Sequence, residues 1–320
     1  SLHDALPILA AFTTLGTAQA QEWPTKTVRL ISPYPVGGGP DGIARLLADK
    51  LAKKWGQPVV VENRPGGNGF IAIDAFKRGA TDWHDLLQLD SVHLTAYPYM
   101  FKKLPYDVNK DFDPIAPMFQ SFLFFVVPTN SKYKTVGDLI ADAKTKPGKI
   151  NYGSWSIGNP VHLGVEELQE LAGIKVEHVL YKETTQLYTS VGTGELDFSI
   201  GSAGTAGPMY RAGKLRLLAV AGPKRMEAYP DVPTVAESGY PGFQSLSWSG
   251  LSVAKGTPQP IVDKLEAAIA QAMQSPSFKQ RLTSVGFVIP PTGSKHYNAF
   301  LKSELDQWTR VIKAAGIKPE

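Results

Sequence analysis

The chain has 320 residues, of which 43% are hydrophobic and 19% charged, enough for one large or two medium folded domains and unlike a disordered chain. It contains no cysteine, which excludes disulfides, thiol catalysis, iron–sulfur clusters and zinc ribbons. The formal net charge of +4 is spread along the chain without a basic run, so we expect no nucleic-acid partner.

Residues 1–20 differ from the rest of the chain. The apolar stretch Leu6–Leu15 is too short to span a bilayer but suits the hydrophobic region of a secretory signal peptide. Ala18-Gln19-Ala20 follows as a small-x-small cleavage pattern. We therefore expect a signal peptide with a truncated start, cleaved near Ala20. The alternative is a buried or disordered N-terminal helix.

From Thr27 onward, β-branched and aliphatic runs alternate with segments of helical periodicity. The predicted strands are 27–34, 58–62, 85–92, 122–127, 149–154, 175–181, 196–200, 215–221 and 246–253. The predicted helices are 41–55, 159–172, 258–273 and 294–315. This alternation is typical of an α/β protein with mostly parallel sheets covered by helices.

Two turn-rich crossings, 101–120 and 222–244, divide this pattern into two lobes. We predict that domain 1 comprises residues 21–121 and 245–320, and that domain 2 comprises residues 122–244. The second domain is then an insertion in the first, and the C-terminal helices return to domain 1.

The sharpest local feature is the segment Pro33–Asp41, PYPVGGGPD, between the first predicted strand and helix. Gly37, Gly38 and Gly39 allow a tight turn that presents backbone N–H groups at a helix start, where the dipole favours an anion. Asp41 suits the helix N-cap. The phosphate-loop and dinucleotide motifs do not fit, so we expect a carboxylate cradle. The alternative is a plain strand–helix turn.

A second strand–turn–helix lies at Asn151–Leu163, NYGSWSIGNPVHL. Asn159 is a predicted N-cap, with the following proline in the first helical turn. Ser154, Ser156 and the backbone around Gly158 could hold a second side of an anion. In two-lobed α/β proteins such turns lie at the carboxyl ends of strands, where ligands bind.

An enzyme interpretation has to be weighed as well. The S-x-S-x-G spacing around Ser156 resembles a nucleophile elbow that lacks its first glycine, and acids and a histidine follow in the order of a hydrolase triad: Asp197, Asp231 and His296. No oxyanion-hole glycine motif is present. A secreted serine hydrolase that uses Ser156 is therefore the alternative function.

Metal and cofactor sites are poorly supported. His162 and Glu166 are four residues apart on a predicted helix, but no third ligand is indicated. His84, His93 and His178 are isolated, as exposed or hydrogen-bonded core histidines are. We expect no metal and no cofactor.

Several segments together resemble one family. The most specific are PYPVGGGPD from Pro33, VVVENRPG from Val59 and DVPTVAESG from Asp231. Others begin at Trp23, Lys102, Lys146, Arg211 and Gly256, so the match spans nearly the whole mature chain. The order of these segments resembles the Bug-type extracytoplasmic solute receptors, the substrate-binding proteins of tripartite tricarboxylate transporters.

This resemblance implies a non-enzymatic periplasmic binding protein of the type II, Venus-flytrap architecture, which binds a small carboxylate. We expect it to be a monomer and to deliver the carboxylate to an integral-membrane permease. A receptor that signals to a sensor kinase is a further alternative. Turns equivalent to Pro35–Asp41 and Ser154–Asn159 hold the carboxylate in the family. The expected ligand-binding residues are Tyr34, Val36, Gly37, Gly38, Gly39, Asp41, Ser91, His93, Ser154, Trp155, Ser156, Gly158, Asn159, His162, Tyr181, Gly201 and Ser202.

One departure from the family bears on the ligand. Family members often have Phe-Asp-Asn where this chain reads Asp197–Gly204, DFSIGSAG, and the missing carboxylate at Gly201 argues against an amino-acid ligand. Small residues at Gly201 and Ser202 leave room, and Trp155 lies in the opposing turn. We therefore expect a bulky or aromatic carboxylate, such as terephthalate.

Overall fold

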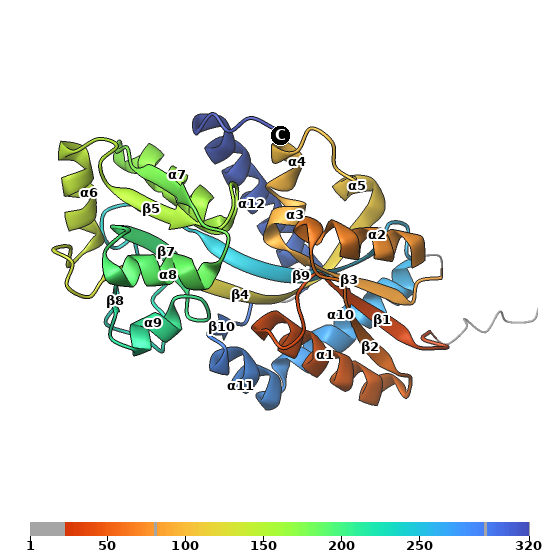
Figure 1. Ribbon diagram of the computed structural model, residues 1–320. Coiled ribbons are helices and arrows are strands. Elements are labelled where there is room, and N and C mark those ends of the chain that lie inside the picture. Colours follow the sequence, from red (N-terminus) through yellow and green to blue (C-terminus); the bar gives the residue numbers. More distant parts are fainter. Residues whose placement is uncertain (1–22, 80–81, 291–292, 320) are drawn as a thin grey trace, which may run out of the picture.

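The computed structural model describes residues 23–79, 82–290 and 293–319, so the predicted signal peptide lies outside the described residues (Figure 1). The first part of the chain forms β1 (Val28–Ser32), α1 (Gly39–Trp55), β2 (Val59–Asn63), the 3₁₀ helix η1 (Gly67–Gly69), α2 (Phe70–Gly79), β3 (Asp85–Asp90), α3 (Ser91–Leu94), α4 (Tyr97–Met100), α5 (Val108–Asp111) and β4 (Phe112–Pro128).

The middle part forms α6 (Val136–Thr145), β5 (Asn151–Ser154), α7 (Pro160–Ala172), β6 (Glu177–Leu180), α8 (Thr184–Thr193), β7 (Phe198–Ser202), α9 (Gly207–Arg211) and β8 (Leu215–Val220). The last part forms β9 (Leu246–Ala254), α10 (Gln259–Gln274), α11 (Pro276–Ser284), β10 (Phe287–Val288) and α12 (Ser294–Ala314). Every strand and helix predicted from the sequence is present, with ends shifted by a few residues in most cases.

The strands form two mixed sheets joined through β4. The path of neighbouring strands is β2-β1-β3-β9-β4-β7-β5-β6, with β8 and β10 also paired to β4. The outer strands are parallel, as predicted: β1 pairs with β2 and β3, and β5 pairs with β6 and β7. The central strands are antiparallel, because β4 leaves the first lobe and β9 returns to it (Figure 1).

Strand β4 connects the lobes and corrects one prediction. The turn-rich segment 101–120 was expected to be irregular, but β4 already begins at Phe112. Its register with β9 shifts after Pro114 and after Pro117, and such irregularities accommodate residues that lack a backbone N–H. Phe112–Phe122 pair with β9, whereas Leu123–Pro128 pair with β7 and β8. The proposed boundary after residue 121 lies at this exchange of partners.

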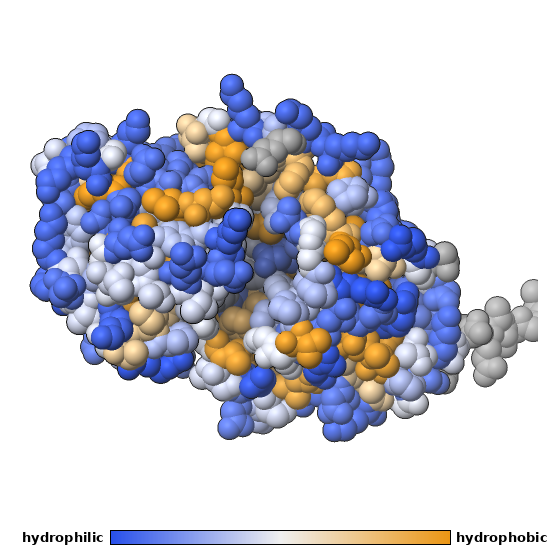
Figure 2. All heavy atoms as spheres, in the orientation of Figure 1, coloured by the Kyte–Doolittle hydropathy of each residue, from blue (hydrophilic) through white to orange (hydrophobic). Residues whose placement is uncertain are grey.

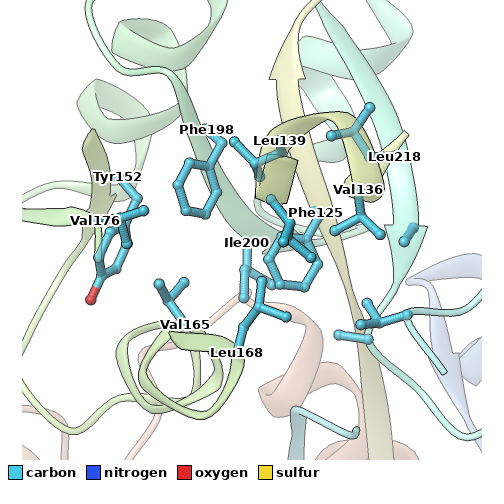
Figure 3. Packing of buried hydrophobic residues seen from close by; sticks show 14 of the residues in the cluster. Phe125, Val136, Leu139, Tyr152, Val165, Leu168, Val176, Phe198, Ile200 and Leu218 are labelled. Atoms are coloured by element: carbon cyan, nitrogen blue, oxygen red, sulfur yellow. The ribbon is translucent and has the colours of Figure 1, made fainter. Parts of the chain in front are cut away.

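Each lobe has its own hydrophobic core. In the first lobe, Leu30, Leu47 and Leu86 of β1, α1 and β3 are fully buried. In the second lobe, Phe125, Tyr152, Phe198 and Ile200 of the sheet pack against α7 residues such as Val165 (Figure 3). The two cores fix the strand ends and helix starts that face the space between the lobes.

Helix α12 lies beside both lobes (Figure 1). Its Trp308 and Ile312 share a buried cluster with Met100 of α4 and Leu163 of α7, and its Arg310 pairs with Glu167 of α7. Within the described ranges, no helix has the length and apolar character that crossing a membrane requires.

Candidate ligand-binding site

A cleft lies between the two lobes, and Figure 2 shows the surface hollowed there. Its larger part, which we call the large cavity, has a volume of about 1020 Å³. The first lobe contributes Tyr34, Gly39 and Asp90, the second lobe contributes Trp155, Ser202 and Arg211, and Phe119–Leu123 of β4 form the floor. A small cavity of about 180 Å³ adjoins it and shares with it Tyr34, Asp90, Trp155, Pro160 and Ser247.

The first turn, between β1 and α1, opens on the large cavity. Helix α1 begins at Gly39, with Gly38 as its N-cap and no side chain bonded to its first N–H groups. The prediction that Asp41 is the N-cap is therefore wrong, because Asp41 lies inside the first helical turn. Since glycine has no side-chain acceptor, the N–H groups of Gly39 and Asp41 stay available to an anion in the cavity, whereas Pro40 between them has no N–H.

Asp41 shapes this turn from within. It is 2% exposed and accepts hydrogen bonds from the Gly37 N–H at 2.9 Å, the Asn63 amide at 2.8 Å and Arg45 at 3.0 Å. Burial acts to raise the pKa of Asp41, but these hydrogen bonds bring it below its ordinary value. Gly37 has φ +88°, a conformation that favours glycine. Asp41 thus supports the turn and does not line the cavity.

The second turn, between β5 and α7, uses most of its donors internally. Asn159 is the N-cap, as predicted, and accepts hydrogen bonds from the Val161 and His162 N–H groups at 2.8 and 3.1 Å. The Gly158 N–H donates to His162 Nδ1 at 3.0 Å. Burial lowers the pKa of His162 to about 4, so its ring is a neutral acceptor near pH 7. Ser156 remains the hydroxyl of this turn that lines the small cavity.

A third element, the start of α3, contributes Asp90 and His93. Asp90 Oδ2 accepts a hydrogen bond from the Tyr34 hydroxyl at 2.8 Å, and Oδ1 accepts one from Ser91 Oγ at 3.0 Å. His93 Nδ1 accepts from the Asp90 N–H at 3.2 Å, and Nε2 lies 2.8 Å from the Asn68 carbonyl. Burial lowers the pKa of His93, which keeps the ring neutral.

The structure brings part of the predicted site together. The residues that line a cavity are Tyr34, Gly39, His93, Trp155, Ser156, Asn159 and Ser202. The others lie behind or beside the walls: Val36, Gly37, Gly38, Asp41, Ser91, Ser154, Gly158, His162, Tyr181 and Gly201. Val36 is 71% exposed and lies outside both cavities, whereas Ser154 is fully buried behind their walls.

The expected space at Gly201 is a further correction. A Cβ at Gly201 would lie 2.7 Å from atoms of both Ala206 and Tyr188, so other side chains already fill that position. The absence of a side chain at Gly201 therefore serves packing within the second lobe and leaves no room for a ligand.

Sequence reasoning missed several wall residues. Asp90 ends strand β3 next to the predicted Ser91, so the rule that places ligands at strand carboxyl ends could have found it. Ser247 lies on the returning strand β9, and Arg211 and Lys224 lie on α9 and on the connection after β8. Only the fold brings these distant segments to one cleft.

The serine-hydrolase geometry is not present in the described part of the chain. Ser156 Oγ accepts a hydrogen bond from the Asn159 amide at 3.4 Å, and no histidine of the described residues lies within hydrogen-bond distance of it. Ser154 Oγ does contact His178 Nε2 at 2.7 Å, but Ser154 is fully buried. Asp197 bonds to the Asn151 backbone at 2.9 Å. Across the described ranges, no cluster of His, Asp and Glu side chains could hold a metal ion.

Two α/β lobes that are joined by crossing strands and enclose a cleft define a two-lobed solute-binding protein of the Venus-flytrap class. Residues 43–317 match the tripartite tricarboxylate transporter family receptor, TctC, and the chain belongs to this family. The family consists of solute receptors for transport and not of enzymes, which confirms the resemblance seen in the sequence.

Individual relatives agree with this assignment. A Cupriavidus necator protein encoded in the gbd 5′ region is 33% identical, over 97% of this chain and 95% of its own. Protein BugT of Bordetella pertussis is 30% identical, over 93% of this chain and 92% of its own. A R. palustris protein solved with adipate has a TM-score of 0.80 and 28% identity, over 93% of this chain and 100% of its own. MatC of Rhodopseudomonas palustris, solved with malate, has a TM-score of 0.74 and 28% identity, over 91% of this chain and 100% of its own.

Proposed function

We propose that the protein captures a small carboxylate in the periplasm and delivers it to the integral-membrane permease of a tripartite tricarboxylate-type transporter. The observation that carries this proposal is the set of anion-binding groups that line the large cavity. The start of α1 has no side-chain cap there, and the cations Arg211 and Lys224 line the same cavity from the other lobe. Neither cation has a carboxylate partner among the described residues. An anion in the cleft would thus meet helix N–H groups on one side and basic side chains on the other.

The structural relatives support the chemical class of the ligand. One was solved with adipate and another with malate, both small carboxylates. Their overall fold is that of this chain, so a carboxylate in the corresponding cleft is the natural expectation here.

Capture by lobe closure follows from the fold. The lobes are connected by β4 and β9, and a ligand that contacts both lobes binds the closed arrangement more tightly than the open one. That difference in affinity shifts the population toward the closed receptor, which then docks on the permease. We propose that the receptor acts as a monomer, with the signal peptide at residues 1–20 directing export.

The larger cavity also supports a bulky ligand, with an aromatic carboxylate such as terephthalate as our specific suggestion. Its volume is at the upper end of the range typical of small-molecule sites. The aromatic side chains that line it are Tyr34, Phe119, Phe122, Trp155, Tyr229 and Phe287. Flat apolar faces of this kind would stack on an aromatic ring.

Thermal unfolding and isothermal titration calorimetry with terephthalate, adipate and malate test this function. A bound ligand raises the stability by RT ln(1 + [L]/Kd) and is recovered unchanged. We expect Arg211→Gln to weaken binding of the carboxylate about three- to tenfold, because the substitution removes one positive charge from the wall of the large cavity. Lys175→Gln, which removes an exposed charge outside the cavities, is the matched control and should bind like the wild type. Absence of binding for every carboxylate would contradict the proposal.

A further inference from the structure

Asp90 places a negative charge in the wall shared by both cavities. Its carboxylate is half-buried, and the hydrogen bonds that it receives within the described residues come from uncharged groups. These are the Tyr34 hydroxyl at 2.8 Å, Ser91 Oγ at 3.0 Å and the Val92 N–H at 3.4 Å. A carboxylate that is partly removed from water favours a cationic neighbour, and none of the residues that the structure describes forms an ion pair with Asp90.

The adjacent histidine does not fill that role. His93 accepts a hydrogen bond at Nδ1 from the Asp90 N–H, so its proton resides on Nε2, which donates to the Asn68 carbonyl. A Cβ at Gly69 would lie 2.2 Å from His93 Nε2, so the ring fits tightly beneath the glycine-rich segment. With both nitrogens engaged and the ring buried, His93 remains neutral and leaves the charge of Asp90 uncompensated.

Aromatic rings surround the same small cavity. Tyr34, Tyr97 and Trp155 line it together with Asp90. Edge contacts with His93 at 5.2 Å and with Phe70 at 5.9 Å hold the Tyr97 ring in place. Burial, together with the charge of Asp90, raises the pKa of Tyr97 to about 12, so this phenol stays neutral. Neutral aromatic faces next to a carboxylate are the surroundings that attract a methylated ammonium group.

The backbone N–H groups near the small cavity are also poorly suited to bind an anion, because they are already hydrogen-bonded within the protein. The first N–H groups of α7 are bonded to Asn159 Oδ1, and the Gly158 N–H is bonded to His162. A carboxylate in the small cavity would therefore meet Asp90 with few free donors and be repelled. The large cavity, by contrast, has the uncapped start of α1 and the cations Arg211 and Lys224.

We propose that the small cavity binds a cationic nitrogen, above all a methylated ammonium, and that the ligand is a zwitterion whose carboxylate lies in the large cavity. This inference rests on the proposed function and narrows its substrate class. Asp90 supplies the charge complement, and Tyr34, Tyr97 and Trp155 supply the faces that enclose the methyl groups. The absence of an acid at Gly201 does not exclude an ammonium group here, because Asp90 supplies a carboxylate at another place in the cleft.

The test uses two carboxylates of equal shape and different charge. The first is 4-(trimethylammonio)butanoate, and the second is 5,5-dimethylhexanoate, in which a carbon replaces the charged nitrogen. Isothermal titration calorimetry of the wild-type protein should give at least about tenfold tighter binding of the ammonium compound. Asp90→Asn, which keeps the helix-capping oxygen but loses the charge, should reduce that ratio to about threefold or less. Asp49→Asn, on the exposed face of α1, is the matched control and should leave the ratio unchanged.

Equal or tighter binding of 5,5-dimethylhexanoate by the wild type would overturn the inference without any variant. An unchanged ratio in a folded Asp90→Asn protein would overturn it as well. If carboxylates bind with no preference for the ammonium compound, the proposed function stands and this inference fails. If neither compound binds, nor terephthalate, adipate or malate, both fail.

Discussion

Met100 of α4 and Gly158 of the turn before α7 meet where the two lobes contact each other, with the Met100 thioether in the space next to the Gly158 Cα. A Cβ at Gly158 would lie 1.9 Å from Met100 Sδ. A second contact of this kind joins Gly286 of the first lobe to Ala203 of the second, where a Cβ at Gly286 would lie 2.4 Å from Ala203 Cβ. Both contacts join the lobes, so any opening movement that separates these segments breaks them.

We expect Gly158→Ala to weaken ligand binding by about tenfold or more, because the added methyl group obstructs this approach of the lobes and the residue has φ +77°. Met100→Ala alone should have a smaller effect. The double variant Gly158→Ala/Met100→Ala should recover part of the lost affinity, because the smaller side chain makes room. Calorimetric affinities of the four proteins give the coupling between the two sites. Strictly additive effects would show that the contact has no role in closure.

Gly38→Val should weaken ligand binding and leave the fold intact. Gly38 has φ −72° and ψ 170°, an extended conformation that valine adopts readily, and the nearest atoms to an added Cβ are 3.8 Å away. The added valine side chain would lie next to the uncapped N–H groups of α1, where we place the carboxylate of the ligand. Thermal unfolding should match the wild type, while the Kd should rise about fivefold or more. Gly137→Val, on α6 of the second lobe, is the control for the same change outside the cleft. An unchanged Kd for Gly38→Val would remove Gly38 from the site.

Ser156 distinguishes a receptor from a hydrolase. Because Ser156 has no histidine partner in the part of the chain that the structure describes, we expect the protein to release no product from 4-nitrophenyl acetate above the buffer rate. Ser156→Ala should leave the affinity for carboxylates within about twofold of the wild type, because Ser156 lines the small cavity and the carboxylate lies in the large one. Ester turnover that disappears in Ser156→Ala would favour the hydrolase.

Glu304 of α12 should make stability depend on pH. It is 4% exposed, accepts hydrogen bonds from the indoles of Trp248 and Trp308 at 3.0 and 3.1 Å, and burial raises its pKa to about 7. The folded protein therefore retains a proton between about pH 4.5 and 7 that the unfolded chain has lost. The stabilising effect of this proton is complete below about pH 4.5 and disappears as the pH rises through 7.

Glu304→Gln removes this titration. The stability of the variant relative to the wild type should rise by on the order of 2 kcal/mol between pH 5 and pH 8. Denaturant unfolding of both proteins at several pH values measures this difference, and the comparison cancels the titrating groups that do not interact with Glu304. Glu170→Gln, on the more exposed part of the contact between α7 and α12, is the control. A difference that is constant with pH would contradict the raised pKa.

The sequence predicted those features that local chemistry determines. The periodicity of α1 and α7 and the cap at Asn159 arise from neighbouring residues, and the structure has them where they were expected. Strand β4 was predicted only from Phe122 onward, because Pro114 and Pro117 are typical of an irregular connection. In addition, the pairing of this part of β4 with β9 depends on residues far away in the chain. Asp41 was misassigned because acids suit both the N-cap and the first turn of a helix.

The walls of the cleft were harder to predict, because they combine segments from both lobes. Ser247 and Arg211 reach the large cavity through the return of β9 and the position of α9, which no local pattern encodes. Gly201 was interpreted as open space, although Tyr188 fills that position from a helix of the same lobe. Asp90 was overlooked next to Ser91, although its place at a strand end marked it.

A crystal structure of the protein with the small molecule that co-purifies with it tests the central claim most directly. We predict a single ligand between the lobes, with a carboxylate oxygen within hydrogen-bond distance of the N–H groups that begin α1. A ligand without a carboxylate, or one whose carboxylate lies outside the cleft and away from α1, would contradict it.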